Sequence, residues 1–472
     1  MPKKPMKDVI VLLPGITGSV LQRNGKDVWA FSGGAITRGL FSLGRSVKDL
    51  ELPAEDPAEV DDLGDGVTAP RVMSDIHLIP GLWKIDGYSK VGTAIKSSFD
   101  VTPGENYFEF AYDWRRDNRV AARRLARQSH DWLKAWRDRS GAADAKLILV
   151  GHSMGGLVSR YFLECMDGWK DTRMLVTFGT PYRGSLNAIR FVAEGMSKKV
   201  LGLTVIDLSP MLRSFTSVYQ LLPVYPCVDL GSGDPVRVTE TDRIANLDAA
   251  RAGAALEFHS EIRQAVDDHE KEDAYLAGRY QIHPIVGTFQ PTLQSVKLDG
   301  DRVEFLRHYG GEDQDGDGTV PRVSATPYEL GNEPHAMFAS ERHGSLQNFD
   351  PVLVQLHGAL TQRAVDLSVY YAFNTKLSLD IDDAYEALEP IPVRVKPEQP
   401  GVDLTAAVEN VDTGELAART ELRAGDEGWH EGEVPPLPPG AYRLTVRGEF
   451  AVDPVTDVFT VLPAAPDPAW ET

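Results

Sequence analysis

At 472 residues the chain is too long for one ordinary hydrophobic core, so its length predicts two domains. Its 42% hydrophobic and 25% charged residues are typical of a soluble globular protein. The 49 basic and 69 acidic residues give a net charge of −20, which argues against nucleic-acid binding and against docking to an anionic membrane by charge alone.

The chain begins with a short apolar run rather than a targeting segment. In MPKKPMKDVIVLLPG the apolar run covers only residues 9–13 and continues into a glycine-containing turn, which predicts the first core strand and not a signal peptide. No stretch approaches the length of a transmembrane helix. We therefore expect a cytoplasmic protein, with the mature form of a secreted protein as the alternative.

Strand-like and helix-like segments alternate over the first two-thirds of the chain. Apolar runs predict strands, and segments with helical periodicity lie between them. The predicted strands are 9–13, 107–112, 147–150, 174–179 and 281–289, and the predicted helices are 90–98, 118–136 and about 154–166. Strands that alternate with helices predict a parallel sheet with helices on both faces.

Residues 186–280 interrupt this alternation with amphipathic, helix-like sequence. Its middle part repeats apolar side chains near a helical period: Ile206, Leu208, Met211, Leu212, Phe215, Tyr219 and Leu222. Such a stripe fits ordinary core packing and, equally well, a lid whose apolar face covers an active site. On the lid hypothesis, Leu212, Phe215 and Tyr219 are the candidate substrate-binding residues.

The sequence changes character near residue 388. Prolines cluster there, and short alternating strands without helical periodicity continue to about residue 465. We expect an α/β domain over residues 1–387, with the lid insertion at about 186–280, and an immunoglobulin-like β-sandwich over residues 388–472. The sandwich carries no catalytic constellation, which indicates an accessory module and leaves open a role in binding a protein partner.

Residues 145–156, AKLILVGHSMGG, combine an apolar strand, a glycine-flanked serine and the start of a helix. Small residues around Ser153 permit a sharp turn that exposes its hydroxyl, and the positive end of the following helix faces the same point. A G-x-S-x-G pentapeptide by itself is common and also fits a plain glycine-rich loop. With a strand before it and a helix after it, the pattern favours Ser153 as a nucleophile.

A serine nucleophile needs a base, and the base needs a carboxylate that orients it. In α/β-hydrolases these partners follow the serine in the order Asp or Glu, then His. That order is satisfied by Asp317, before Gly-Thr-Val-Pro, and by His343, in the loop SERHGSL before a helix. Asp315 is the nearest rival for the acid, and His308 and His335 are the rivals for the base.

The same aspartates also resemble the start of a calcium-binding loop. Asp313, Asp315 and Asp317 followed by glycine match D-x-D-x-D-G. The twelfth position is Ser324 rather than the bidentate glutamate, and Pro321 interrupts the loop. The pattern therefore disfavours a calcium site, and no metal or cofactor is predicted.

Acyl transfer also needs two backbone N–H groups that point at the developing oxyanion. Met154, directly after the predicted nucleophile, is one candidate donor. Ile16 in the loop LLPGITGS is the other, because Gly15 lets the backbone approach closely. The alternative for this loop is a plain turn at the end of a strand.

Six motifs occur in one order along the chain: PGITGS (14–19), YDWR (112–115), GHSMGG (151–156), FGTPYRGS (178–185), SFTSVYQLLP (214–223) and DGDGTVP (315–321). Together they resemble the lecithin:cholesterol acyltransferase family, which includes phospholipid:diacylglycerol acyltransferases and bacterial esterase or lipase relatives. The resemblance covers most of residues 8–365 in scattered blocks. Residues 20–90 contain no cysteine, where secreted animal members carry a disulfide, so the family's lid and membrane-contact elements are not carried over.

The resemblance implies an α/β-hydrolase fold and a serine hydrolase or acyltransferase; the helical lid insertion is expected from residues 186–280 alone. Its substrate would be a lipid or other acyl ester. Transient contact with a membrane surface is expected from the lipid substrate and not from family elements. The residue roles carried over are nucleophile for Ser153, acid for Asp317, base for His343, oxyanion donors for Ile16 and Met154, and structural partners for Asp113 and Arg115.

Two other functions stay open at this point. One is a small-ester or amide hydrolase with the same residues. The other is a catalytically idle hydrolase fold that serves as a binding scaffold, against which the intact Ser, Asp and His argue.

Overall fold

The computed structural model of the chain describes residues 2–29, 50–53, 56–74, 77–79, 83–200, 203–300, 302–330, 336–361, 374–448 and 451–463. The rival base His335 lies outside these residues.

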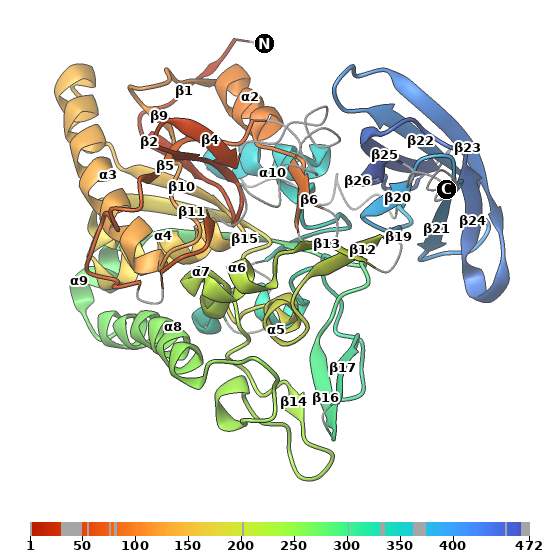
Figure 1. The fold of residues 1–472 in the computed structure, drawn as a ribbon. Coiled ribbons are helices and arrows are strands. Elements are labelled where there is room, and N and C mark those ends of the chain that lie inside the picture. Colours follow the sequence, from red (N-terminus) through yellow and green to blue (C-terminus); the bar gives the residue numbers. More distant parts are fainter. Residues whose placement is uncertain are drawn as a thin grey trace.

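A six-stranded parallel sheet forms the centre of the N-terminal part (Figure 1). Its strands in spatial order are β18 (Met337–Ala339), β15 (Gln281–Gly287), β11 (Thr172–Phe178), β10 (Leu147–His152), β2 (Val9–Leu13) and β9 (Tyr107–Glu109). Every residue of β2 and β10 is buried. Continuous apolar runs such as VIVLL suit these strands because a parallel sheet is covered on both faces.

Helices cover this sheet as the alternation predicts. α3 (Asn118–Ser140) packs on α4 (Met154–Cys165), and both contact the sheet. α2 (Ser89–Ser98) and α10 (Asp350–Leu360) pack against each other on the other side of the sheet in Figure 1. The predicted parallel sheet with helices is confirmed.

The order of the strands creates a topological switch point between β2 and β10. The chain leaves β2 for β9 on one side and then returns to β10 on the other side of β2. Ligands of open parallel sheets bind outside the carboxyl ends of the strands at such a point. The loop after β2 and the turn after β10 therefore meet where a binding site is expected.

Smaller sheets accompany the central one. Their strands are β1 (Lys4–Pro5) with β8 (Phe99–Asp100), β4 (Lys26–Trp29) with β3 (Ser19–Arg23) and β5 (Val67–Val72), and β6 (His77–Ile79) with β7 (Trp83–Ile85). β14 (Val228–Asp229) pairs with the hairpin of β16 (Ser295–Asp299) and β17 (Arg302–Leu306), which projects from the body of the molecule in Figure 1.

The segment between β11 and β15 is only partly helical. Its elements are α5 (Leu186–Ala193), β12 (Ser197–Val200), β13 (Leu203–Asp207), α6 (Ser209–Ser214), α7 (Thr216–Gln220), β14, α8 (Ala249–His269) and α9 (Asp273–Gly278). The expectation of helix-like structure is wrong at residues 203–207, which pair with β12 as a hairpin. The apolar stripe is also broken at Phe215, whose extended backbone (φ −76°, ψ 121°) separates α6 from α7.

The C-terminal part is an eight-stranded sheet. In spatial order its strands are β19 (Leu377–Asp380), β21 (Ile391–Pro397), β24 (His430–Val434), β23 (Leu416–Ala424), β22 (Leu404–Asn410), β25 (Gly440–Gly448), β26 (Val455–Leu462) and β20 (Ala384–Glu386). β21 alternates buried and exposed residues along its length, as expected of a strand with one face on a core. β19 and β20 belong to this sheet although they precede residue 388.

One hydrophobic cluster joins the two ends of this sheet. It contains Val393 and Val395 of β21 together with Leu444 and Val446 of β25. The long strand β23 makes the connection, since its residues 416–422 pair with β22 and its last two pair with β24. The sheet therefore folds back on itself around its own core.

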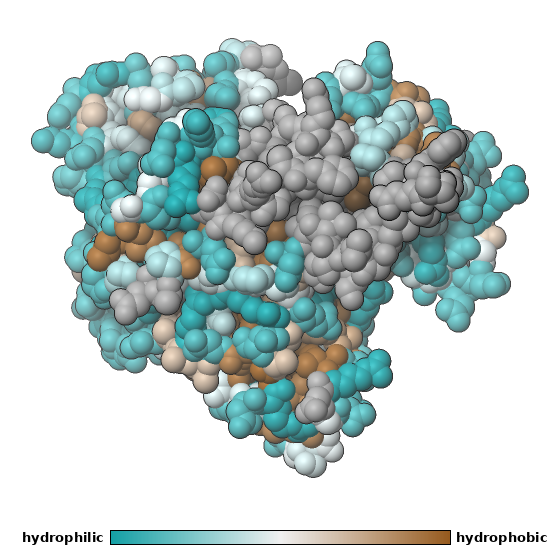
Figure 2. Space-filling view, in the orientation of Figure 1, coloured by the Kyte–Doolittle hydropathy of each residue, from teal (hydrophilic) through white to brown (hydrophobic). Residues whose placement is uncertain are grey.

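The visible surface is mainly hydrophilic, in keeping with the charge of the chain (Figure 2). Hydrophobic side chains gather on this face over the region of β14 and β16. Among the described helices, none combines the length and the apolar character that crossing a bilayer requires.

Candidate active site

Ser153 stands at a sharp turn between β10 and α4. Its φ of 52° and ψ of −124° are uncommon for a residue with a side chain and store backbone strain of about 1–3 kcal/mol. Neighbouring glycines make the turn sterically feasible. A Cβ at Gly155 would lie 2.5 Å from the Pro14 carbonyl oxygen, and one at Gly156 would lie 2.1 Å from Thr180 Oγ1.

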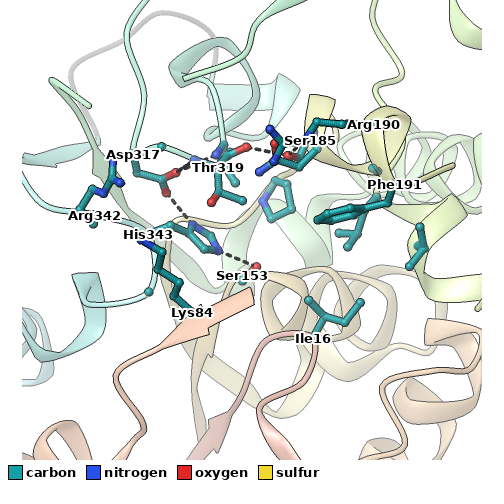
Figure 3. A pocket seen from close by; sticks show the side chains of 18 of the residues that line it. Ile16, Lys84, Ser153, Ser185, Arg190, Phe191, Asp317, Thr319, Arg342 and His343 are labelled. Atoms are coloured by element: carbon teal, nitrogen blue, oxygen red, sulfur yellow. Dashed lines mark hydrogen bonds and ion pairs between the residues drawn. The ribbon is translucent and has the colours of Figure 1, made fainter. Parts of the chain in front are cut away.

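Ser153, His343 and Asp317 form one hydrogen-bonded chain (Figure 3). His343 Nε2 lies 3.0 Å from Ser153 Oγ, and His343 Nδ1 lies 2.7 Å from Asp317 Oδ2. All three residues are buried, although 190 positions separate the serine from the histidine in the sequence. The fold thus brings together the three residues that were predicted from their order along the chain.

The Asp317 carboxylate is held in place by backbone donors. Its Oδ1 accepts hydrogen bonds from Thr319 N at 2.9 Å and Val320 N at 2.7 Å, and its own carbonyl accepts from His343 N at 2.9 Å. With Oδ2 facing Nδ1, the proton of a neutral His343 belongs on Nδ1. Nε2 is then free to accept the proton of the serine hydroxyl.

The rivals for these positions point elsewhere. The Asp315 carboxylate accepts the backbone N–H groups of Phe289 and Gly316, and Asp313 accepts the amide of Gln294. The carboxylates of the three aspartates in the calcium-like pattern therefore bind different partners. His308 is exposed in the loop after β17.

The loop after β2 lies directly against the serine. A Cβ at Gly15 would lie 2.9 Å from Ser153 Cβ, so only glycine allows this approach. Tyr112 supports the loop by donating its hydroxyl to the Pro14 carbonyl at 2.8 Å. Within the described part of the chain, the N–H groups of Ile16 and Met154 are not used by another hydrogen bond.

A second buried histidine connects this loop to the loop of His343. Gly15 N–H donates to the Tyr88 hydroxyl at 2.8 Å, and Tyr88 O lies 2.8 Å from His152 Nδ1. His152 Nε2 lies 3.1 Å from the carbonyl oxygen of His343. Burial, together with the nearby His343, lowers the pKa of His152 to about 3. A neutral ring that accepts at Nδ1 and donates at Nε2 satisfies both contacts.

Sequence reasoning did not identify this connection. His152 stands beside the serine in GHSMGG, so its position in the motif was a signal for it. Tyr88 carried no signal, because it lies 64 positions away and meets the ring only in the folded chain.

A pocket of about 170 Å³ opens at Ser153. Its apolar lining residues include Ile16, Ala188, Phe191, Val218 and Leu221, and Arg190 lines the pocket beside Phe191. The His343 side is charged and comprises Lys84, Arg342, Asp383 and Asp457. Figure 3 shows Phe191 across the pocket from Lys84 and Arg342.

The candidate substrate-binding residues do not line this pocket. Leu212, Phe215 and Tyr219 are buried in the main hydrophobic core. The Phe215 ring packs edge-on against Trp114 at 5.6 Å, and the Arg251 guanidinium lies 4.3 Å from the centre of the Tyr219 ring. The core-packing interpretation of the stripe is therefore correct for these three residues. The pocket is lined instead by Val218, which lies on α7, and by Leu221, which directly follows α7.

The predicted structural pair in YDWR is confirmed. The Arg115 side chain is fully buried and donates to both carboxylate oxygens of Asp113, at 2.9 and 2.7 Å. It also donates to Asp65 at 2.8 Å and to the Leu50 carbonyl at 3.1 Å. One cation thus joins the start of α3 to the segment before β5.

Sequence comparison finds similarity to one family model and to relatives named as phospholipase A and acyltransferase. Residues 84–263 match the family model described as lecithin:cholesterol acyltransferase. Lysosomal phospholipase A and acyltransferase of Homo sapiens is 25% identical over 255 residues, which cover 52% of this chain and 58% of the relative. The protein of the same name from Rattus norvegicus is 27% identical over 229 residues, covering 46% and 52%. The chain thus spans a little more than half the length of the curated relatives it matches.

Solved structures align over larger shares of the chain at lower identity. A chain of the Tle4–Tli4 complex is 14% identical with a TM-score of 0.48, covering 76% of this chain and 99% of its own. The mature Bacillus licheniformis lipase BlEst2 is 14% identical with a TM-score of 0.32, covering 75% and 94%. The segment matched by the family model contains Ser153, whereas Asp317 and His343 follow it in the sequence. Over these residues the chain is similar in sequence to the lecithin:cholesterol acyltransferase family.

Proposed function

We propose that this protein is a serine hydrolase or acyltransferase of lipid or other acyl esters, built on an α/β-hydrolase fold. The observation that carries the proposal is the hydrogen-bonded chain from Ser153 through His343 to Asp317, at the switch point of a parallel sheet. A structural role alone does not require a strained serine in contact with a buried histidine.

The proposed mechanism transfers the acyl group in two steps. Ser153 Oγ attacks the ester carbonyl as its proton passes to His343 Nε2, and the imidazolium is stabilised by Asp317. The Ile16 and Met154 N–H groups stabilise the oxyanion. Collapse of the intermediate breaks the ester C–O bond, and His343 returns the proton to the leaving alcohol. Water or a second alcohol, deprotonated by His343, then releases the acyl group from the serine.

Pocket chemistry supports an acyl substrate. The wall formed by Ile16, Phe191, Val218 and Leu221 suits a hydrocarbon chain, which binds by burial of apolar surface. The relatives named phospholipase A and acyltransferase support a lipid ester as its source. In this proposal residues 186–280 form the lid over the site, transient contact with a membrane surface delivers the lipid, and the C-terminal sheet is a two-layer immunoglobulin-like sandwich.

The proposal is tested by mass spectrometry of products after incubation with mixed phospholipids, with and without an added long-chain alcohol. Release of fatty acid alone identifies a hydrolase, and an ester of the added alcohol identifies a transferase. Absence of both products, from phospholipids and from p-nitrophenyl esters alike, would contradict the proposal.

The size of the pocket favours a second candidate, a small-ester hydrolase. Its volume of about 170 Å³ is below the about 300–1,000 Å³ usual for sites that enclose larger ligands. A rate profile across p-nitrophenyl esters of increasing chain length separates the two: a maximum at acetate or butyrate favours the small-ester enzyme, and a maximum at long chains favours the lipid enzyme.

Replacing Gly155 with alanine (Gly155→Ala) is expected to lower kcat/KM roughly 100-fold, the scale of losing one oxyanion donor. The new Cβ would lie 2.5 Å from Pro14 O and 2.7 Å from Leu13 O. Because both are backbone atoms, the loop that carries Ile16 must move. The measurement is steady-state hydrolysis of a p-nitrophenyl ester.

Gly253→Ala is the matched control, because a Cβ at Gly253 meets no atom within 4 Å and the residue lies inside α8. It should keep full activity and gain about 0.5–1 kcal/mol of stability, since alanine favours a helix over glycine. Equal activity of the two variants would contradict the claim that the loop after β2 approaches Gly155 too closely for a side chain.

A further inference from the structure

The C-terminal sheet reaches into the pocket at Ser153. Asp457 of β26 and Asp383, which precedes β20, both line it, together with Lys84 and Arg342 of the N-terminal part. An accessory domain without a role at the active site is not expected to contribute side chains to the wall of the pocket. These contacts indicate that the C-terminal sheet, which was predicted from the sequence to be an accessory module, helps to form the site.

Asp457 is the centre of this contact. Its Oδ2 lies 2.9 Å from Lys84 Nζ and 2.9 Å from both Arg342 Nε and Arg342 Nη2, and its Oδ1 accepts Val458 N at 2.8 Å. Lys84 Nζ also lies 2.6 Å from Asp383 Oδ1. The Asp457 side chain is only 4% exposed, so these interactions are weakly screened by water. Burial acts to raise the pKa of Asp457, but the two cations lower it below its ordinary value.

Arg342 directly precedes His343, and the residue before it is also tied to β26. Glu341 Oε1 accepts Thr456 N at 3.0 Å as well as Arg342 N at 2.8 Å. The Arg342 guanidinium makes a further bond to the Leu379 carbonyl at 3.2 Å. Consecutive residues of the histidine loop are thus bound to consecutive residues of one C-terminal strand.

The opposite side of the same loop rests on the segment after β7. Gly344 O accepts Asp86 N at 2.9 Å, and a Cβ at Gly344 would lie 2.1 Å from Lys84 O. Asp86 in turn pairs with Arg443 of β25. The histidine loop is therefore held between two segments that are themselves joined by ion pairs across the same interface.

We propose that the C-terminal β-sheet positions the base of the acyl-ester site, with the Asp457 carboxylate holding the loop of His343 through Arg342 and Lys84. The inference rests on the proposed function, because it concerns the geometry between His343 and Ser153. Asp457 is a positioning residue: it touches neither the serine nor the imidazole and acts through the two cations.

The test compares Asp457→Asn with the wild-type protein in p-nitrophenyl ester hydrolysis. Loosening the loop should lower kcat about tenfold, since small displacements of a reacting group cost this much or more, while KM stays within about twofold. The variant also removes one negative charge from the cluster that contains Lys84, Arg342, Asp383, Asp380 and Glu341. Loss of a nearby negative charge disfavours an imidazolium, so the acid limb of the kcat/KM profile should move to lower pH by about half a unit. A role in stability alone would leave kcat of the folded variant unchanged.

Two further variants sharpen the result. Asp457→Glu keeps the charge but shifts it by one methylene, so it should lower kcat while the acid limb stays in place. Glu431→Gln removes an exposed carboxylate of the same sheet that pairs with Arg394 at 3.1 Å, and it should leave every parameter unchanged. If Asp457→Asn does not fold, Asp457→Glu decides the question through its kcat.

Turnover by the wild-type protein tests the proposed function, and kcat of the Asp457 variants tests the positioning role separately. Wild-type turnover that disappears in Ser153→Ala establishes the proposed function before Asp457 is tested. Wild-type turnover with unchanged kcat in folded Asp457 variants overturns the positioning role alone, as does an equal loss in Glu431→Gln. An inactive wild-type protein overturns both.

Discussion

Replacing Ser153 with alanine (Ser153→Ala) is expected to lower kcat for p-nitrophenyl ester hydrolysis by roughly 10⁴-fold or more, the scale of removing the nucleophile from a Ser-His-Asp site. The variant loses the one hydroxyl that lies 3.0 Å from His343 Nε2. No other described serine hydroxyl forms a hydrogen bond with that nitrogen. A fluorophosphonate probe should label wild-type Ser153 and fail to label the variant, and peptide mass spectrometry identifies the site.

Loss of activity has this meaning only if the variant folds. Alanine occupies less space than serine and meets the same φ of 52°, so the change in unfolding free energy should be within about 1 kcal/mol. Ser260→Ala is the matched control, because its hydroxyl bonds only within α8, to the Leu256 carbonyl at 2.9 Å. Turnover that persists in Ser153→Ala, or labelling at another serine, would show that the nucleophile lies elsewhere.

Replacing Arg115 with methionine (Arg115→Met) is expected to lower the free energy of unfolding by about 3–5 kcal/mol, the cost of breaking a buried ion pair by removing one partner. The guanidinium is fully buried and forms ion pairs with Asp113 and Asp65. Methionine fills most of the volume but leaves two partly buried carboxylates and the Leu50 carbonyl without their donor. The measurement is urea unfolding followed by tryptophan fluorescence.

Arg127→Met is the control for this change. Arg127 pairs with Asp61 at 2.7 Å, but its side chain is 56% exposed, and exposed pairs contribute about 0–1 kcal/mol. A similar loss of stability in both variants would mean that loss of charge in general, and not the buried pair, accounts for the effect. A fully stable Arg115→Met would contradict the structural role assigned to YDWR.

Local signals in the sequence were sufficient for the parts of the site that neighbouring residues define. Ser153 could be predicted because an apolar strand, small flanking residues and a helix leave few conformations for LILVGHSMGG. Asp317 and His343 could be paired with it by chain order and by their loops before turns or helices. Asp113 and Arg115 meet within one motif, so their ion pair was also accessible.

Periodicity could not assign the faces of the segment before α8. An apolar stripe marks side chains that avoid water, and a core and a substrate pocket satisfy that condition equally. All five residues Leu212, Phe215, Val218, Tyr219 and Leu221 belong to the core, but only Val218 and Leu221 also line the pocket. The extended backbone of Phe215 ends α6 and interrupts the helical period before α7, and this break has no simple mark in the amino-acid pattern.

By itself, the sequence determined five of the six strands of the parallel sheet, the helices between them and the identity of the serine turn, because these depend on residues close together along the chain; the edge strand β18 was not predicted. Only the tertiary structure decided what surrounds His343. Lys84 and Asp457 are 373 positions apart, and Tyr88 and His152 are 64 apart, so their meeting depends on how the sheets pack. The sequence does not show whether a charged group or a hydroxyl is buried. A buried one needs a hydrogen-bonding partner, and the tertiary structure determines which residue that partner is.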